Sequence, residues 1–413
     1  MILSQKKIIL AVTGSISAYK AVFLLRLLKK AGADVKVVLS PAVSHFVGEL
    51  TFSSLSGHPV FCGLWNANWS EHVSLGNWAD LMVVAPATAN TLAKFAHGLC
   101  DNAITAVYLA AACPVMVAPA MDADMYKHPS TQRNMKTLRE FGNEVLPVGD
   151  GFLASGLQGP GRLLEPEDIF NRIVHTLSPK PLAGKKLLLT AGPTREPIDP
   201  VRYISNHSSG KMGYAIASVA ARMGAKVTLV SGPTNLPIPY GVIGVKVQSS
   251  QEMYEAVHQV AQEQDIFIMS AAVCDYAPSE VANKKIKKHQ DVFSLDMTKT
   301  PDILKSIGAI KKPSQFLVGF ALETDNEMAN AQGKLSRKNL DFIVLNSLKD
   351  KGAGFGHDTN KVTLIDKSGE VERYPLKRKI EVAQDIIDKV IRMLHAPNDS
   401  LEINTNPQGI LNS

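Results

Sequence analysis

Several features that mark other classes of protein are missing from this chain of 413 residues. Its four cysteines have no C-x-x-C spacing, so the sequence shows neither a disulfide framework nor a cysteine pair spaced for metal binding. No apolar run reaches the length that spans a membrane, and the N-terminus lacks the basic, apolar and cleavage regions of a secretion signal. These absences predict a protein of the reduced cytoplasm.

A strong excess of charge is missing as well. The formal net charge of +6 comes from 44 basic and 38 acidic residues, and the one dense basic run is Lys284 to His289. Nucleic-acid binding needs a broad basic surface with aromatic side chains that stack on bases, and only 6% of the residues are aromatic. We therefore expect small anionic molecules as partners, and neither nucleic acid nor a membrane.

The order of apolar and polar segments predicts two domains. An apolar strand, a turn rich in Gly and Ser, an amphipathic helix and another strand follow one another from residue 6, and the same order begins again after residue 184. Residues 176–186 between them contain two prolines and a glycine, which is typical of a linker. Apolar strands that alternate with helices indicate parallel sheets covered on both faces, with ligands at the carboxyl ends of the strands.

The C-terminal region departs from this order. After about residue 345 the sequence predicts short alternating strands and a last helix over 377–394. The tail from Ala396 onward has no apolar face, so 396–413 is predicted to be disordered.

The segment from Ala191 to Ala217 contains the most informative pattern. It follows an apolar strand, places Gly, Ser, Thr, Arg, Asn and Lys in an irregular loop, and then enters a helix of small residues. Backbone N–H groups at a helix N-terminus, with glycines that allow close approach and cations nearby, can hold a phosphate. Lys211 is followed by Met212 and no glycine stands five residues before Gly210, which excludes a Walker A loop, and G-x-G-x-x-G is absent.

As a whole string, AGPTREPIDPVRYISNHSSGKMGYAIA closely resembles the signature of phosphopantothenate–cysteine ligase. This resemblance implies a domain over 184–395 that joins 4′-phosphopantothenate to cysteine, with CTP activating the carboxylate as an acyl-cytidylate. It implies that Asn206 holds the acyl-cytidylate and that Lys285 contacts the triphosphate and serves the second step. Magnesium is expected to bridge the phosphates, with Asp275 as a weak candidate ligand.

The same resemblance implies a set of nucleotide contacts. Lys334 and Lys338 stand at i and i+4, which places both ammonium groups on one helix face. Taken alone, such lysines are more often solvated surface charges, and it is the order of all the motifs together that favours nucleotide binding. The expected CTP contacts are Met269, Asp275, Lys285, Pro301, Asp302, Ile303, Leu304, Phe320, Lys334 and Lys338.

Residues 6 to about 175 resemble the flavin-containing cysteine decarboxylases, which remove CO2 from phosphopantothenoylcysteine. The matching strings are GSISAYK from Gly14, EHVSLGNWADLMVVAPATANT from Glu71 and ASGLQGPGR from Ala154. The resemblance implies an FMN-binding domain over 1–178, with His72 as the catalytic histidine. When CO2 leaves an unactivated carboxylate, the electron pair that stays behind has no acceptor. FMN would create that acceptor by oxidising the thiol carbon. The FMN contacts that the resemblance implies are Gly14, Ser15, Ile16, Ser40, Ala87 and Thr88.

Two positions depart from that family's pattern. Asp122 stands where the family has an amide that contacts the substrate carboxylate, and Ser155 stands where the flap has a cysteine proton donor. An ionised Asp122 would repel a carboxylate, and a hydroxyl is a far weaker acid than a thiol. Three possibilities stay open: another acid or water completes the reaction, Asp122 is held neutral by its site, or the domain has lost turnover.

The predicted fold class is α/β, with two Rossmann-like domains that each contain a mainly parallel sheet: a flavodoxin-like flavoprotein domain and a nucleotide-binding ligase domain. The predicted function is a bifunctional enzyme of coenzyme A biosynthesis, in which ligation precedes decarboxylation. A ligase whose flavin domain has reduced or lost activity is one alternative, and a non-catalytic flavoprotein regulatory subunit is another. A nicotinamide oxidoreductase is disfavoured because the dinucleotide fingerprint is absent. The family resemblance implies a homo-oligomer.

Overall fold

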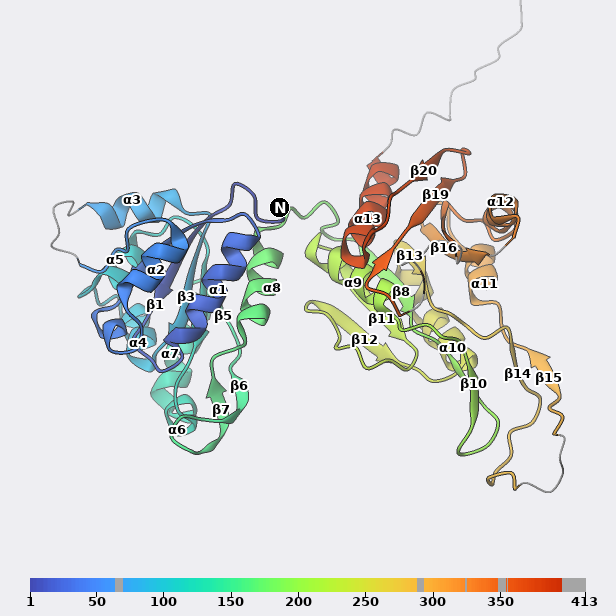
Figure 1. The fold of residues 1–413 in the computed structure, drawn as a ribbon, viewed down its shortest axis with the longest axis horizontal. Coiled ribbons are helices and arrows are strands. Elements are labelled where there is room, and N and C mark those ends of the chain that lie inside the picture. Colours follow the sequence, from blue (N-terminus) through green and yellow to red (C-terminus); the bar gives the residue numbers. More distant parts are fainter. Residues whose placement is uncertain (64–69, 288–292, 324, 348–353, 355, 396–413) are drawn as a thin grey trace, which may run out of the picture. The chain divides into compact units, whose positions relative to one another are not determined.

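The computed structural model describes residues 1–63, 70–287, 293–323, 325–347, 354 and 356–395. The chain divides into two compact units, Met1–Ser178 and Pro179–Ser413 (Figure 1). The disorder predicted for 396–413 lies outside the described residues, and so does His289 of the basic run.

The first unit is built on a parallel five-stranded sheet with the order β2-β1-β3-β4-β5. The strands form because their residues are almost all apolar and buried, as expected for a sheet covered on both faces. From β1 the chain adds β2 on one side and then β3 on the other, so the strand order reverses between β1 and β3. Ligands bind at such a switch point in open α/β sheets. The strand bounds are β1 Lys7–Val12, β2 Asp34–Leu39, β3 Leu81–Ala87, β4 Val115–Pro119 and β5 Glu144–Val145.

Helices cover both faces of this sheet and bury two separate apolar cores. One core contains side chains of α1, α2 and α8, and the other contains side chains of α3, α4, α5 and α7. A two-stranded hairpin, β6–β7, follows β5 and extends beyond the sheet (Figure 1). The remaining bounds are α1 Ala18–Lys30, η1 Pro41–His45, α2 Glu49–Ser56, α3 Glu71–Trp78, α4 Ala89–His97, α5 Ala103–Ala110, α6 Ala123–Lys127, α7 Pro129–Glu140, β6 Gly149–Phe152, β7 Gln158–Arg162 and α8 Pro166–Leu177.

The second unit contains an eight-stranded sheet with the order β12-β11-β8-β13-β16-β17-β19-β20. The six strands from β12 to β17 are parallel, whereas β19 and β20 add to the β17 edge in the antiparallel sense. The chain adds β11 and β12 on one side of β8 and then β13 on the other, so the strand order reverses between β8 and β13 and marks a second switch point. The strand bounds are β8 Lys186–Ala191, β11 Lys226–Ser231, β12 Val242–Lys246, β13 Ile266–Met269, β16 Phe316–Glu323, β17 Phe342–Ser347, β19 Val362–Asp366 and β20 Val371–Arg373.

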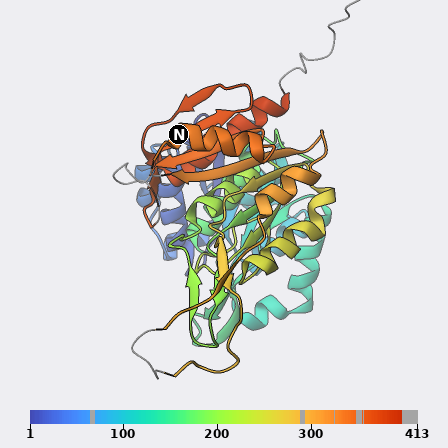
Figure 2. The ribbon, with the colours of Figure 1, turned by 90° about the vertical axis from the view of Figure 1, so that its right-hand side faces the viewer.

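Helices α9 and α13 cover one face of the second sheet, and α10, α11 and α12 cover the other. Two short hairpins, β9–β10 and β14–β15, extend from the carboxyl end of the sheet as arms (Figures 1 and 2). The remaining bounds are β9 Arg195–Pro197, β10 Tyr203–Ser205, α9 Lys211–Arg222, α10 Ser250–Val260, η2 Ala261–Glu263, β14 Tyr276–Pro278, β15 Met297–Lys299, α11 Ile303–Ile310, α12 Glu327–Arg337, β18 Thr359–Asn360, β21 Lys377–Arg378 and α13 Lys379–His395.

The predicted fold class is confirmed, because both units are α/β with a parallel sheet or a mainly parallel one. One boundary differs from the prediction. The last helix begins at Lys379 instead of residue 377, because Lys377 and Arg378 pair with Thr359 and Asn360 as a short strand. Within the described part of the chain, every helix is too short or too polar to cross a membrane.

Candidate active sites

The carboxyl ends of β1 and β3 are joined at the first switch point by Thr13. Its hydroxyl donates a hydrogen bond to the carbonyl of Pro86 at 2.7 Å and accepts the N–H of Thr88 at 3.1 Å. Thr88 in turn begins α4, where its side chain accepts the N–H of Thr91. The two loops that follow these strands are therefore held together, as the predicted FMN contacts require.

Gly14 follows Thr13 and lies where the chain passes very close to another loop. A Cβ atom at this position would lie 2.5 Å from the Cβ of Ala42, so no larger residue fits without a shift. The Gly14 N–H donates to the Ser40 hydroxyl at 3.1 Å. This close packing brings the backbone of the loop, with the hydroxyls of Ser15 and Ser17, to the start of α1, where phosphates bind in many α/β proteins.

A cavity of about 440 Å³ opens above this loop, between the start of α4 and the β6–β7 hairpin. It brings together six of the residues predicted from the sequence, from four separate segments. These residues are Gly14, Ser15, Ile16, Thr88, Asp122 and Ser155.

Asp122 and Ser155, the two departures from the family pattern, are in direct contact. The Ser155 hydroxyl, in the loop of the β6–β7 hairpin, donates a hydrogen bond to Oδ2 of Asp122, which precedes α6. Strand β7 is held against the same segment, since the Met121 N–H donates to the Gly161 carbonyl at 3.0 Å. The hairpin therefore closes one side of the cavity through residues 121, 122 and 155.

Three predicted residues of this unit do not line the cavity. Ser40 supports the Gly14 loop from outside, Ala87 is fully buried in β3, and His72 lies on α3. Conversely, Tyr19 and Arg162 line the cavity without having been predicted individually. Both fall inside strings that matched the family, but nothing in the local pattern distinguishes them from surface residues.

In the second unit, a cavity of about 460 Å³ lies at the carboxyl ends of β8, β13 and β16. Nine of the ten residues predicted to contact CTP line it, and they come from four elements and the loops between them. These residues are Met269, Asp275, Pro301, Asp302, Ile303, Leu304, Phe320, Lys334 and Lys338. Tyr276, Lys299 and Thr300 line the cavity as well and were not predicted.

The two predicted lysines of α12 and its C-terminus are fixed in this cavity by different partners. The Lys334 ammonium donates to the Phe320 carbonyl at 2.7 Å, and Lys338 forms an ion pair with Asp302 at 2.8 Å. Burial lowers the pKa of Lys334, and the neighbouring charge of Lys338 lowers it further. Burial alone would raise the pKa of Asp302, but the hydrogen bonds from Lys338 and from the Lys305 N–H outweigh it and leave that pKa below its ordinary value.

A second cavity of about 380 Å³ adjoins the first, because Asp275, Phe320 and Lys334 line both. It is bounded by the start of α9, where Gly210 has φ +75°, and by Asn206. One amide hydrogen of Asn206 is taken by the Ala272 carbonyl at 3.0 Å. The amide nitrogen also lies 3.9 Å from Sγ of Cys274, a weak acceptor that a ligand oxygen can replace, and the amide carbonyl can contact a ligand as well.

Lys285 is exposed and lines neither cavity of its own unit. It lies on the segment that leads from β14 to β15. This segment is anchored next to Lys285 by Ile286, whose N–H donates to the Asp199 carboxylate at 3.1 Å and whose carbonyl accepts from Arg202 at 2.8 Å. The structure therefore does not bring Lys285 together with the other predicted ligase residues.

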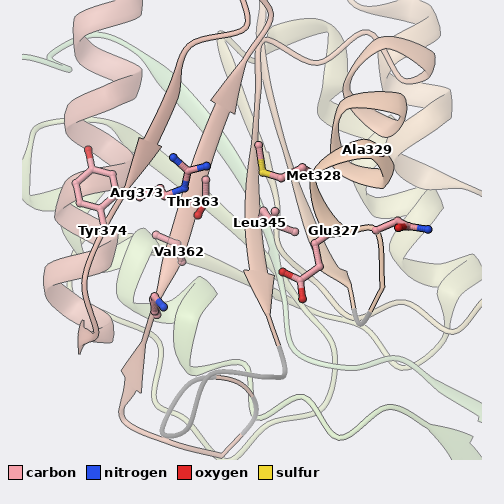
Figure 3. A pocket seen from close by; sticks show the side chains of 10 residues that line it. Glu327, Met328, Ala329, Leu345, Val362, Thr363, Arg373 and Tyr374 are labelled. Carbon is pink, nitrogen blue, oxygen red and sulfur yellow. The ribbon is translucent and has the colours of Figure 1, made fainter.

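No cluster of three or more His, Cys, Asp or Glu side chains that could hold a metal ion occurs among the described residues. A wider groove of about 710 Å³ lies elsewhere in the second unit and contains none of the predicted residues. Figure 3 shows Arg373 on one wall above Thr363, and Glu327 and Met328 of α12 on the other. Because Arg373 and Glu327 lie on separate walls, their charges do not meet at one ligand group. We therefore place the candidate active sites in the other cavities.

Comparisons with known proteins define the class first. Residues 2–178 match the family described as Flavoprotein, and residues 182–394 match the family described as DNA/pantothenate metabolism flavoprotein C-terminal domain. A flavoprotein domain followed by that C-terminal domain is thus the composition of this chain.

Relatives align with most of this chain. The chain is 44% identical over 395 residues to the coenzyme A biosynthesis bifunctional protein CoaBC of Bacillus subtilis, which covers 94% of this chain and 97% of that protein. It is 50% identical over 355 residues to a cysteine/cysteine sulfinic acid decarboxylase from an unknown prokaryotic organism, covering 84% of this chain and 99% of that protein. A crystal structure of the C-terminal domain of a CoaBC protein is 46% identical, with a TM-score of 0.45, and covers 52% of this chain and 98% of that domain. The chain belongs to the family of bifunctional coenzyme A biosynthesis proteins.

Proposed function

We propose that the chain converts 4′-phosphopantothenate to 4′-phosphopantetheine in two reactions. The second unit joins the acid to cysteine with CTP through an acyl-cytidylate, and the first unit removes CO2 from the resulting 4′-phosphopantothenoylcysteine. The observation that carries this proposal is the near full-length similarity to bifunctional coenzyme A biosynthesis proteins, 44% identity over 94% of the chain. A cytoplasmic location and assembly into a homo-oligomer stay predictions.

In the ligase unit, the two adjoining cavities suit a nucleotide and an activated acid. Lys334 and Lys338 supply positive charge for phosphates in the larger cavity, and the backbone N–H groups that begin α9 supply donors in the smaller one. We assign Asn206 to the acyl-cytidylate, because its amide is held on one side by Ala272 and is neutral. Preorganised donors of this kind stabilise negative charge that develops during acyl transfer.

Magnesium fits this site as a phosphate-bound ion. Mg²⁺ usually retains several waters and takes one or two carboxylates besides phosphate oxygens. Asp275, which lines both cavities, is our candidate carboxylate, whereas Asp302 lines the larger cavity and is paired with Lys338.

In the flavin unit, the residues around Gly14 fit FMN. The Gly14 loop has no room for a Cβ, and it brings backbone donors and the Ser15 hydroxyl to the cavity of about 440 Å³. Thr88 at the start of α4 adds a second hydroxyl to the same cavity. FMN, when bound, supplies the oxidation of the thiol carbon that makes loss of CO2 possible. Phe152 and Tyr19 line the same cavity and contribute aromatic rings to its wall.

One incubation tests the two reactions together. Purified protein is given 4′-phosphopantothenate, cysteine, CTP and Mg²⁺, and products are followed by mass spectrometry. We expect phosphopantothenoylcysteine to appear first and 4′-phosphopantetheine to follow. If the products stop at phosphopantothenoylcysteine, the first unit has no decarboxylase activity, and if neither appears, the ligase assignment is wrong.

A second candidate activity for the flavin cavity is the decarboxylation of free cysteine or cysteine sulfinic acid. Asp122 is the observation that favours it, together with the name of the relative at 50% identity. The nitrogen of free cysteine is a charged ammonium, whereas in phosphopantothenoylcysteine it is part of a neutral amide. A carboxylate binds an ammonium through a charge-assisted hydrogen bond, and Asp122 has a second oxygen available beside the one that Ser155 contacts.

Arg162 completes the recognition of a free amino acid in this second proposal. It lines the same cavity, where one guanidinium nitrogen lies 3.4 Å from Glu165, and its other donors can bind a substrate carboxylate. We expect Asp122→Asn to lower kcat/KM for free cysteine by about tenfold or more and to raise it for phosphopantothenoylcysteine, measured by release of CO2. If wild-type protein releases no CO2 from either free amino acid, this second activity is excluded while the bifunctional one stands.

A further inference from the structure

Lys379 is a buried lysine that the chain brings to the smaller ligase cavity from far along the sequence. It opens α13 and lines this cavity with Asn206 and Gly210, although only 8% of its surface is exposed. The local sequence, a run of basic residues at 377–379, resembles an ordinary solvated helix start. Its burial is therefore a product of the tertiary structure.

The ammonium of Lys379 is held by backbone carbonyls. It donates to the Gly354 carbonyl at 3.1 Å and to the His357 carbonyl at 2.6 Å. An ammonium has three donors, and these two carbonyls are its acceptors within the described part of the chain, so a third N–H can donate to a ligand.

A second buried lysine of the same helix provides a direct comparison. Lys389 is 3% exposed and forms ion pairs with Asp366, Glu370 and Glu372 at 2.7 to 2.9 Å. These carboxylates raise its pKa in spite of burial. For Lys379, burial lowers the pKa and the nearby charge of Lys211 lowers it further, with Asp358 opposing.

A buried cation that is held by carbonyls, as Lys379 is among the described residues, is costly, because carbonyl dipoles replace the lost hydration incompletely. Lys211 adds a second cation at the same cavity, where it is paired with Asp358 at 2.7 Å. The start of α9 adds the partial positive charge of a helix N-terminus. An oxyanion placed among these three groups would supply the missing negative charge.

We infer that Lys379 is a phosphate-binding residue of the ligase cavity, where its third N–H donates to a phosphate oxygen. This inference rests on the proposed ligase function. The phosphate belongs either to the triphosphate of CTP or to 4′-phosphopantothenate, since both are substrates of that reaction. In either case Lys379 and Lys334 both line the cavity that holds the anion.

Calorimetric titration of the full chain with each substrate tests the inference and identifies the phosphate. We expect Lys379→Met to weaken binding of CTP or of 4′-phosphopantothenate by about tenfold or more, to leave cytidine binding unchanged, and Lys379→Arg to restore most of the affinity. The substrate whose affinity falls is the one that carries the contacted phosphate. Arg378→Met is the matched control, because it removes one charge at the neighbouring position, where Arg378 is exposed and paired with Glu381.

The outcomes separate this inference from the proposed function. If wild-type protein binds neither CTP nor 4′-phosphopantothenate, the ligase proposal itself fails. If wild-type protein binds both and Lys379→Met binds both with unchanged affinity, Lys379 only fixes the backbone at 354–357 and the inference is wrong. The inference is also wrong if Lys379→Met weakens binding of cytidine as much as binding of the phosphate-bearing substrates and Lys379→Arg does not restore the affinity.

Discussion

Asp122 and Ser155, the two residues that depart from the pattern of the flavin-containing decarboxylases, contact each other in the folded chain. Because the Ser155 hydroxyl donates to the Asp122 carboxylate, the two departures form one hydrogen-bonded pair. A carboxylate and a hydroxyl satisfy each other, whereas a thiol is a weak hydrogen-bond donor. This pairing gives a physical reason for both changes to occur in the same chain.

The weak acidity of the Ser155 hydroxyl, in the loop of the β6–β7 hairpin, leads to a first prediction. Ser155→Cys should speed the formation of 4′-phosphopantetheine, because a thiol of pKa about 8.5 is a far better proton donor than a hydroxyl. The rate is measured by mass spectrometry under single-turnover conditions. Ser155→Ala serves as the control, since it removes the hydroxyl without adding an acid. Equal rates for Ser155→Cys and Ser155→Ala would mean that another group donates the proton.

Lys285 leads to a second prediction at the same scale. It is exposed on the β14–β15 arm, away from the cavities of its own unit, yet the family resemblance assigns it to the triphosphate. We expect Lys285→Gln to slow ligation by about two decades or more, as the loss of a charge-assisted contact to a developing anion typically does. Coupled release of pyrophosphate measures the rate. Lys284→Gln, at an exposed neighbouring position, should have little effect, and near wild-type ligation by Lys285→Gln would contradict the role.

At the scale of elements, loops after parallel strands create the sites, and glycines determine how closely those loops approach. We expect Gly14→Ala to abolish or strongly weaken flavin binding, because the added Cβ would lie 2.5 Å from the Cβ of Ala42 and displace the loop between β1 and α1. The visible absorbance of purified protein reports the bound flavin. Gly48→Ala is the control, since nothing lies within 4 Å of its added Cβ. A yellow Gly14→Ala protein with normal flavin content would show that this loop is not the cradle.

The ion cluster beneath α13 leads to a prediction about stability and pH. Burial would raise the pKa values of Asp366 and Glu372, but hydrogen bonds from Lys389 and other donors lower both to about 2, from ordinary values of 3.8 and 4.5. A lowered carboxyl pKa stabilises the folded state above the unfolded value, so this contribution is complete above about pH 5 and is lost as the pH falls toward 2. We expect Lys389→Met to cost about 3 to 5 kcal/mol, because it leaves the buried Asp366 carboxylate without its cation, although Glu372 retains its ion pair with Arg392.

Urea unfolding of wild-type and Lys389→Met protein between pH 7 and pH 3 tests this prediction. The difference in unfolding free energy should shrink as the pH falls, because protonation removes the unpaired charges. Arg378→Met, which breaks an exposed ion pair, should cost less than about 1 kcal/mol. A difference for Lys389→Met that is independent of pH would contradict the electrostatic origin.

At the scale of the whole molecule, the chain folds as two compact units. We propose that residues 1–178 form the decarboxylase domain and 184–395 the ligase domain, in line with a division of the fold at Ser178 and Pro179. A fragment that starts at Pro179 should ligate cysteine and accumulate phosphopantothenoylcysteine, and adding a fragment of residues 1–178 should restore 4′-phosphopantetheine. Product analysis by mass spectrometry decides the outcome. If the C-terminal fragment is folded but makes no phosphopantothenoylcysteine, the ligase depends on the flavin unit.

The sequence by itself determined the fold class and the loops that bear chemistry. Apolar strands alternating with amphipathic helices specify covered parallel sheets, because burial on both faces requires such strands. The loop at Gly14 and the loop over 206–210 follow strands, where ligands bind. These are local patterns, set by residues close together in the chain. Nine of the ten predicted CTP contacts line one cavity because the carboxyl ends of neighbouring strands meet at one edge of the sheet.

The tertiary structure decided which distant residues meet. It placed Lys379 in the ligase cavity, joined Asp122 to Ser155 across the flap, and left Lys285 and His72 away from the cavities of their own units. It also gave two lysines of one helix opposite environments, with three carboxylates around Lys389 and carbonyls around Lys379. Local periodicity shows which face of a helix is buried, whereas the charges that meet that face come from segments folded against it, and only the packed chain determines them.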